Sequence, residues 1–145
     1  MKRILALAVL AVMMPSGSIS HLDSNTPEVV ARHQAMMFVG AQMRVLSQQA
    51  RGAVPFNSEQ ANTSAAAIAV IALTFPHLFP EGSIVGENTD ALESILENRE
   101  DFKVKSEALG KAASDLSDIG SVEQLSSGLA ALGQTCRSCH SLYRK

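Results

Sequence analysis

Apolar residues recur along this chain every three or four positions, a spacing that predicts amphipathic helices and no strands. The first helix is expected to begin at Thr26-Pro27-Glu28, where a threonine cap precedes a proline and an acid in the first turn. Gly52 is expected to end it. Its seam is apolar apart from one charged residue, and comprises Val29, Arg32, Met36, Val39, Met43, Leu46 and Ala50.

The second helix is expected to follow Asn57, a cap with Gln60 three residues later, and to include the alanine-rich stretch 61–72. It should stop near Phe75-Pro76. The stretch 76–89 contains two prolines and two glycines. This composition predicts a long connection that crosses from one end of a helical bundle to the other.

A third helix is expected to begin at Asp90, with Asp90 and Glu93 as its capping pair, and to bend or break near 98–101. Its core face would carry Phe102, Leu109, Ala112, Leu116 and Ile119. Ser121 and Gln124 form a capping box for a fourth helix. The seam of that helix comprises Val122, Leu125, Leu129, Leu132, Cys136, Cys139 and Tyr143. The pattern indicates an all-α bundle of four helices.

The amino terminus has the layout of a secretory signal peptide. Met1-Lys2-Arg3 is basic, the run Ile4–Met14 is apolar, and small or turn-prone residues occupy 15–18. The apolar run is too short to span a bilayer comfortably. We therefore expect residues 1–20 to be a cleaved signal peptide and residues 21–145 to form one domain with a single core.

Charge and hydropathy argue against nucleic-acid binding and against a membrane-spanning protein. Without the signal peptide, which holds two of the 12 basic residues, 10 basic residues stand against 14 acidic ones, a formal net charge of −4. Because the basic residues are scattered, nucleic-acid binding is disfavoured. Residues 21–145 contain no long apolar run, so we expect no membrane span in the mature protein and a location in a Gram-negative periplasm.

The residues with the most specific chemistry lie near the carboxyl terminus. Cys136-Arg137-Ser138-Cys139-His140 matches the C-x-x-C-H pattern for covalent attachment of haem c. Two thiols so spaced on a helix can each add to one vinyl group of a porphyrin edge, and the next residue then presents its imidazole to the iron. We therefore expect one covalent haem c with His140 as an axial ligand of the iron.

Other uses of the two cysteines fit the sequence less well. A zinc site needs four ligands, and the only further candidates are His21, His33 and His77, with no second cysteine pair. A thioredoxin-type pair opens a helix after a strand, whereas this pair closes a long helix. A disulfide within the motif would close a very short loop and would constrain the unfolded chain little.

Together with these motifs, the mature chain resembles the class II c-type cytochromes, which include the cytochrome c prime family. The resemblance rests on Cys-His-x-x-Tyr-Arg at residues 139–144, Gly-x-x-Pro-Phe at 52–56 and Phe-Pro-Glu-Gly-Ser at 79–83. Ile95-Leu96 followed by Phe102 is similar to the family's Ile-Trp and later Phe. Leucine stands in place of the tryptophan, a departure that affects local packing.

The resemblance implies an antiparallel four-helix bundle with haem between the helices. His140 would lie on one side of the iron, and Met36 matches the family position on the other side. A shift of register by one residue would exchange Met36 for Met37. Arg144 resembles a family arginine close to the proximal imidazole.

The resemblance also accounts for the charge in the first apolar seam. In the family an arginine at the position of Arg32 lies near the haem propionates. The next residue is His33, where the family often has glutamine, and it is a further candidate for the haem site, although such histidines are more often at the surface. The candidate cofactor-binding residues are therefore Cys136, Cys139, His140, Arg32, Met36, His33 and Arg144.

The expected function is electron transfer by a five-coordinate haem iron that can also bind NO or CO. The alternative is a low-spin carrier in which Met36 is the sixth iron ligand. The least favoured hypothesis is a structural or metal-binding bundle without haem. An enzyme is disfavoured, because Met36 and its apolar neighbours supply no distal acid–base group. Redox proteins are the expected partners, and the family's use of the first two helices as a dimer face implies a homodimer.

Overall fold

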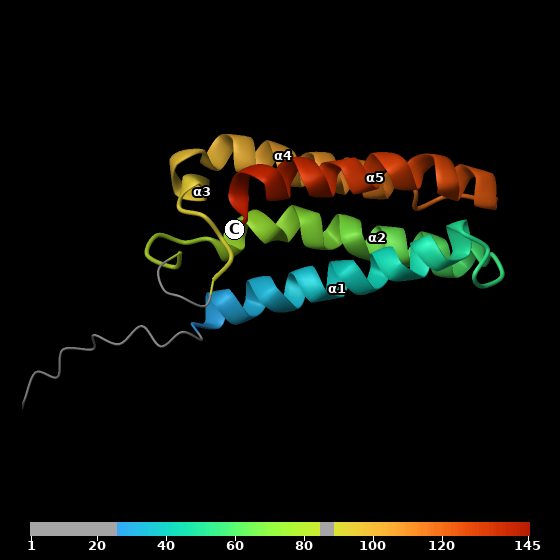
Figure 1. Cartoon of the computed structure of the whole chain (residues 1–145), viewed down its shortest axis with the longest axis horizontal. Coiled ribbons are helices and arrows are strands. Elements are labelled where there is room, and N and C mark those ends of the chain that lie inside the picture. The colour runs from blue at the N-terminus through green and yellow to red at the C-terminus, as the bar shows by residue number, and fades with distance from the viewer. Residues whose placement is uncertain (1–25, 85–88) are drawn as a thin grey trace, which may run out of the picture.

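The computed structural model describes residues 26–84 and 89–145, in which all the regular structure is helical. Helices α1 (Pro27–Ala50) and α2 (Ser58–Thr74) form one hairpin, and α4 (Arg99–Ser114) and α5 (Val122–Tyr143) form a second (Figure 1). Between the hairpins lie the 3-10 helix η1 (Phe75–Leu78) and the single-turn helix α3 (Ser94–Glu97). The expected all-α four-helix bundle is confirmed. The predicted signal peptide, residues 1–20, lies outside the described residues.

Local sequence signals set most helix ends. Thr26 and Asn57 each accept the backbone N–H three residues later, at 3.4 and 2.8 Å. Ser121 and Gln124 form the predicted capping box at the start of α5. Gly52 has a φ of 68°, a left-handed conformation that glycine adopts without steric cost, just after the end of α1. These four predictions are confirmed.

The predicted start of the third helix at Asp90 is wrong. Helix α3 begins only at Ser94, and α4 begins at Arg99. The residues around Ala91 do not form a helix because they run beside the end of the chain, where Ala91 forms an isolated antiparallel bridge with Arg144. The backbone groups that a helix would use are therefore engaged by residues more than fifty positions later.

The predicted length of the third helix is also wrong at its other end. Helix α4 stops at Ser114, so Leu116 and Ile119 lie in the connection to α5. Leu116 donates its backbone N–H to the Ala113 carbonyl at 3.0 Å, which is a tighter turn than in an α-helix. Both side chains are nevertheless buried, as their apolar character predicts.

The connection between α2 and α4 does not cross the bundle, contrary to the prediction. Consecutive long helices run in opposite directions, so α2 ends and α4 begins at the same end of the molecule (Figure 1). Ser106, early in α4, donates to the Ala72 carbonyl near the end of α2 at 2.7 Å. Asn62, early in α2, accepts from the Ile119 backbone beyond the end of α4 at 3.0 Å. These pairs confirm the antiparallel order.

Two groups of buried side chains form the core. The larger runs along the bundle and consists of Val39, Leu46, Ala61, Ala65, Ile68, Ala113, Leu116, Ile119, Leu125 and Leu132. The smaller group, called the end cluster below, closes the bundle end that holds α3 and consists of Phe79, Ile84, Ile95, Phe102 and Tyr143. The connection between α2 and α4 therefore contributes side chains to the core at this end.

One described segment, Ser58–Leu78, is long and apolar enough to cross a membrane by length and composition alone. It comprises α2 and η1, and one face of α2 is buried in the bundle through Ala61, Ala65, Ile68 and Ala72. Apolar core helices of bundles meet the same criterion. Packing within the bundle accounts for the buried third of this segment, whereas Val70 and Leu73 are exposed.

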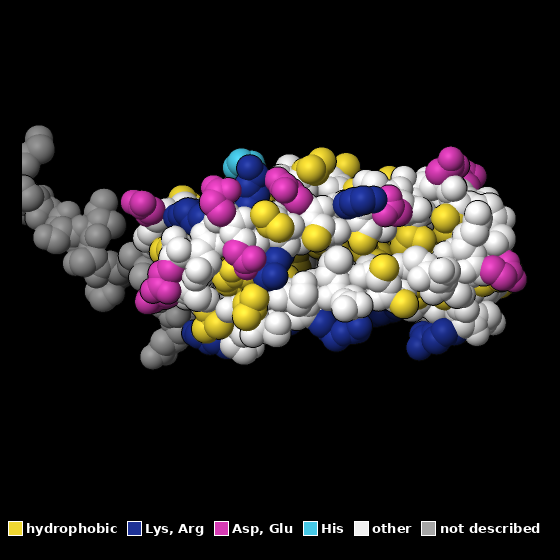
Figure 2. Space-filling view, turned by 90° about the horizontal axis from the view of Figure 1, so that it is seen from above, with side chains coloured by type: hydrophobic (Ala, Val, Ile, Leu, Met, Phe, Trp, Pro, Cys, Tyr) yellow, Lys and Arg dark blue, Asp and Glu magenta, His cyan; other side chains and the backbone are white. Residues whose placement is uncertain are grey.

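Figure 2 shows the face of the bundle that lies uppermost in Figure 1, formed by α4 and α5. Lysine and arginine side chains alternate there with acidic ones, and apolar side chains are visible between them (Figure 2). Several of the charges on α4 form i,i+4 pairs, such as Lys111 with Asp115 at 2.8 Å. This face therefore has no large region of one sign.

Candidate functional site

The C-x-x-C-H motif lies in the last two turns of α5, at the bundle end closed by the end cluster. Cys136 and Cys139 are half-buried, and Cys139 packs against the end cluster. Arg137 and Ser138, between them, are exposed. The three-four spacing of the α5 seam therefore turns both thiols toward the interior while the two middle residues face solvent.

Both cysteines are free thiols in the structure. Burial raises the pKa of Cys136, and it also raises that of Cys139, where the nearby charge of Lys105 opposes the effect. Each sulfur therefore keeps its proton at neutral pH, and the two thiols are less prone to form a disulfide with each other than exposed cysteines are. Side by side and protonated, they suit the predicted addition of S–H across two vinyl groups.

His140 follows at the rim of the site. His140 is largely exposed, and partial burial of its ring, followed by the positive charge of Arg144, lowers its pKa, which favours the neutral imidazole. A neutral imidazole is the form that binds a metal. Arg144 caps the end of α5 by donating its backbone N–H to the His140 carbonyl at 3.3 Å. This backbone contact keeps Arg144 one turn after His140, and the place of its guanidinium beside the imidazole stays a prediction.

Arg32 is buried, with only 6% of its surface exposed. Its Nη2 donates to the Ser83 carbonyl, its Nε donates to the Glu28 carbonyl at 3.2 Å, and its guanidinium lies 4.6 Å above the ring centre of Phe79. Burial lowers the pKa of Arg32, and the charge of Glu28 opposes this. The remaining nitrogen, Nη1, is buried and has no hydrogen-bond partner among the described residues.

Aromatic rings connect Arg32 to the attachment motif. The Phe79 ring, below the guanidinium, packs edge-on against Phe102 at 4.9 Å between centres, and Phe102 packs against Tyr143 at 5.2 Å. Cys139 borders the same cluster. Residues from α1 and α5, more than a hundred positions apart, are therefore assembled at one end of the bundle.

The other predicted residues on α1 separate into inward and outward positions. Met36 is half-buried and packs against the larger core group, whereas Met37 is 64% exposed. The structure therefore favours Met36 over Met37 as the residue that faces the interior. His33 is exposed on the surface of α1, next to the buried Arg32.

These features fit a haem with carboxylate side groups. The buried Nη1 of Arg32 is a charged donor without an acceptor, and such a group is costly unless a ligand pairs with it. A propionate is an acceptor of the right charge for it. The paired thiols of Cys136 and Cys139 and the neutral ring of His140 supply the other contacts that covalent haem attachment requires.

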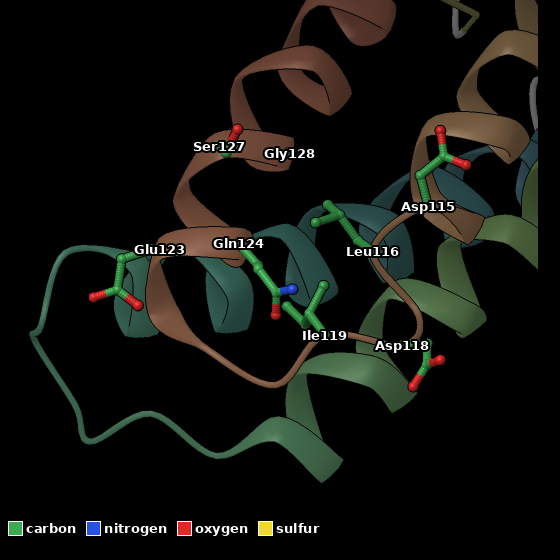
Figure 3. A pocket seen from close by; sticks show the side chains of 8 residues that line it. All are labelled: Asp115, Leu116, Asp118, Ile119, Glu123, Gln124, Ser127 and Gly128. Carbon is green, nitrogen blue, oxygen red and sulfur yellow. The ribbon is translucent and has the colours of Figure 1, made fainter.

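A surface hollow at the opposite end of the bundle does not show comparable chemistry. It lies around the connection between α4 and α5, and its acidic side chains, Asp115, Asp118 and Glu123, point in different directions (Figure 3). Within residues 26–84 and 89–145, no group of three histidine, cysteine or acidic side chains is placed to hold a metal ion. The structure gives no support to a non-haem metal site in the described part of the chain.

Several residues around the site were not predicted to be site residues. Phe79 and Ser83, which hold the Arg32 guanidinium, lie in one of the motifs that carry the family resemblance, so that motif was a usable signal. Asp101 accepts a hydrogen bond from the Tyr143 hydroxyl, and Asp90 pairs with Arg144. No local sequence pattern predicts the interaction of either acid, because its partner is more than forty positions away in the sequence.

Comparison with known proteins gives one consistent result. Residues 28–144 match the family model described as Cytochrome C′. The cytochrome c′ of Pararhodospirillum photometricum is 37% identical over 117 residues, which cover 79% of this chain and 93% of that protein. The cytochrome c-556 of Agrobacterium tumefaciens (strain II Chrys) is 32% identical over 119 residues, which cover 81% of this chain and 96% of that protein.

Solved structures agree with these relatives. Cytochrome c′ from Rhodopseudomonas palustris superposes with a TM-score of 0.77 at 26% identity, over 83% of this chain and 98% of that one. A nitric oxide complex of a mutant cytochrome c prime from Alcaligenes xylosoxidans superposes with a TM-score of 0.73 at 23% identity, over 81% of this chain and 94% of that one. The second match is a likeness of fold alone.

Proposed function

Because the chain belongs to the cytochrome c′ family, we propose that it is a periplasmic electron carrier whose five-coordinate haem iron also binds NO or CO. Proteins of this family are haem electron-transfer proteins, and the chain binds one covalent haem c. When bound, the haem supplies a one-electron Fe(III)/Fe(II) couple and a coordination position for a small ligand.

The observation that carries the assignment of the site is the pair of inward-facing thiols followed directly by His140 at the end of α5. Cys136 and Cys139 would form the two thioether bonds, and His140 would be the proximal ligand. Arg32 would pair with a propionate through its otherwise unpartnered Nη1. Arg144 would lie beside the proximal ring, where its charge already acts on His140.

Attachment can be tested by the mass and spectrum of the purified protein. Covalent haem should survive denaturation and acid extraction in the wild-type protein. Cys136→Ser and Cys139→Ser should each leave a single thioether, and the double variant should lose covalent haem. Haem that stays covalently bound in the double variant would place the attachment elsewhere.

The proposal of an open coordination position rests on the surroundings of Met36. This side chain packs among apolar core residues, and its neighbour Val39 is buried. Among the residues of α1, the only titratable side chain that is buried is Arg32, and its free nitrogen would be used by a propionate. Such a site suits small uncharged ligands and lacks the acid–base groups of a peroxidase, so we propose a carrier and not an enzyme.

The alternative is a low-spin carrier in which the Met36 thioether binds the iron. The specific observation in its favour is that Met36, and not Met37, is directed to the interior. Optical spectra of the two oxidation states, with and without CO, separate the two proposals. A five-coordinate iron should give high-spin spectra and a CO-induced shift, whereas ligation by methionine should give low-spin spectra in both states.

Met36→Ala provides the matching mutational test. It should leave the spin state of a five-coordinate protein nearly unchanged, and it should convert a methionine-ligated protein to high spin. Met37→Ala is the control, because Met37 is 64% exposed and should have no effect in either case. A low-spin spectrum that persists in Met36→Ala would rule out Met36 as the ligand.

Export and assembly are further parts of the proposal. The mature protein from the periplasmic fraction should begin at His21, and a mass that includes residues 1–20 would contradict cleavage. A homodimer through α1 and α2 agrees with the exposed apolar side chains Met37, Val70 and Leu73, at 64, 60 and 66% exposure. Leu73→Lys should shift sedimentation from dimer to monomer, while Val104→Lys on α4, with a comparably exposed apolar side chain, should not.

A further inference from the structure

The last residues of the chain are held by the segment that precedes α3. Leu92 donates its backbone N–H to the Tyr143 carbonyl at 3.0 Å, and the backbone N–H of Lys145 donates to the Asp90 carbonyl at 2.8 Å. Ser94 adds a side-chain hydrogen bond to the Leu142 carbonyl at 3.1 Å. The backbone positions of Asp90 and of the residues that follow His140 are therefore fixed relative to each other.

Within this paired segment, the Arg144 guanidinium donates two hydrogen bonds to one carboxylate oxygen of Asp90. The distances from Oδ2 are 3.0 Å to Nη2 and 3.3 Å to Nε. Arg144 and Asp90 side chains are 54 and 68% exposed, so solvent and salt weaken the pair. The backbone bonds on both sides nevertheless keep the two charges together without a large ordering cost.

The pair lies beside the residue that would ligate the iron. The Arg144 backbone N–H is bonded to the His140 carbonyl at 3.3 Å, and the charge of Arg144 acts on the His140 ring. A positive charge at that place favours the reduced state of the site, since reduction adds one negative charge. A carboxylate bonded to the same guanidinium offsets this preference.

We propose that Asp90 sets the reduction potential of the site by offsetting the charge of Arg144 beside His140. The inference rests on the proposed role of His140 as axial ligand. The reaction takes one electron from an external small-molecule mediator and transfers no proton, so the relevant quantity is the midpoint potential of the holoprotein.

The test measures that potential by optical redox titration in four proteins: wild type, Asp90→Asn, Arg144→Gln and the double variant. Asp90→Asn exposes the charge of Arg144, and it should favour the reduced form about two- to threefold, which is ~20–30 mV at 59 mV per tenfold. Arg144→Gln should shift the potential in the opposite direction, and the double variant should lie close to wild type. The shifts should shrink in high salt.

A purely structural role predicts a different pattern. If Asp90 and Arg144 only hold the chain end, both single variants loosen the same contact, so their shifts share one sign and do not cancel in the double variant. Asp90→Glu keeps the charge and should retain the wild-type potential. Asp118→Asn, which removes an exposed acid at the opposite end of the bundle, is the control.

The outcomes also separate this inference from the proposed site. Each variant is first checked for covalent haem, because absence of covalent haem in the wild-type protein refutes the attachment site and not the charge pair. If the wild type carries haem and Asp90→Asn shifts its potential no more than Asp118→Asn, the inference about Asp90 is wrong. Shifts of equal sign in Asp90→Asn and Arg144→Gln would also overturn it.

Discussion

Replacement of Arg32 by leucine tests how the α1 half of the site is held. Arg32 is the buried cation of α1, and its guanidinium is shared between the Ser83 carbonyl, the Glu28 carbonyl and the face of the Phe79 ring. Leucine fills part of the same space with apolar atoms and supplies none of these contacts. The side chain is 6% exposed, so water cannot readily replace what is lost.

The size of the effect follows from the individual contacts. The Ser83 carbonyl would be buried without a donor, at a cost of ~1–3 kcal/mol, and the lost cation–π contact adds ~0.5–2 kcal/mol. Glu28 lies in the first turn of the helix, where water can reach its carbonyl, and the buried leucine regains ~1–2 kcal/mol of transfer free energy. The net expectation from these protein contacts is a loss of about 2 kcal/mol in the free energy of unfolding, to which loss of the propionate pair would add in the holoprotein.

Denaturant unfolding of the holoprotein, followed by helical circular dichroism, measures this loss. Arg32→Lys keeps the charge but has a single donor group, so it should lose about half as much. Arg44→Leu is the control, because Arg44 is exposed on the same helix and has no hydrogen bond or ion pair among the described residues. Equal midpoints for Arg32→Leu and Arg44→Leu would refute the argument that Arg32 holds this end of the bundle.

Three further predictions concern other parts of the fold. Burial and the hydrogen bond to Asp101 raise the pKa of Tyr143 from 10.0 to about 12. Folding stability should therefore fall as the pH rises between these values, because the tyrosine of the unfolded chain loses its proton first. Tyr143→Phe should abolish this fall in pH-dependent unfolding, and since Tyr143 is the only tyrosine and the chain has no tryptophan, its ultraviolet difference spectrum reports the titration directly. Gly128→Ala should lower the stability measured by thermal unfolding by ~1–2 kcal/mol, because a Cβ there would lie 2.4 Å from the Leu116 side chain. Gly40 has open space around it, so Gly40→Ala should raise the stability by ~0.5–1 kcal/mol. Ser121→Ala should cost ~1 kcal/mol through loss of the capping box, as measured by denaturant unfolding, and an unchanged midpoint would contradict the role of that cap.

Features that depend on neighbouring residues were predicted well from the sequence. The caps at Thr26, Asn57 and Ser121 and the glycine at 52 each act within a few positions, so the signal and its effect lie in the same short stretch. The inward direction of Cys136 and Cys139 also follows from helical spacing alone. A periodic pattern is therefore sufficient to locate the attachment motif on the core side of its helix.

Features that depend on distant residues were predicted poorly. Asp90 and Glu93 have the composition of a helix start, but the backbone near Asp90 pairs with the end of the chain, and this tertiary contact overrides the local preference. The length of the connection after Pro76 suggested a crossing, whereas Phe79 and Ile84 use that length to fill the end cluster. The position of a buried side chain beyond a helix end, as at Leu116, is likewise a consequence of packing.

Helices α5 and α1 would hold the haem through different kinds of contact, and this difference determines which contacts are lost first when the domain is damaged. On α5 the contacts to the haem would be thioether bonds, whereas on α1 they would be packing by Met36 and a hydrogen bond from Arg32, in a helix that begins at Pro27. Helix ends open more readily than helix centres. Opening of the first turns of α1 would therefore change the surroundings of the haem without releasing it. Damage at the amino-terminal end of the domain would appear as an altered spectrum at constant haem content.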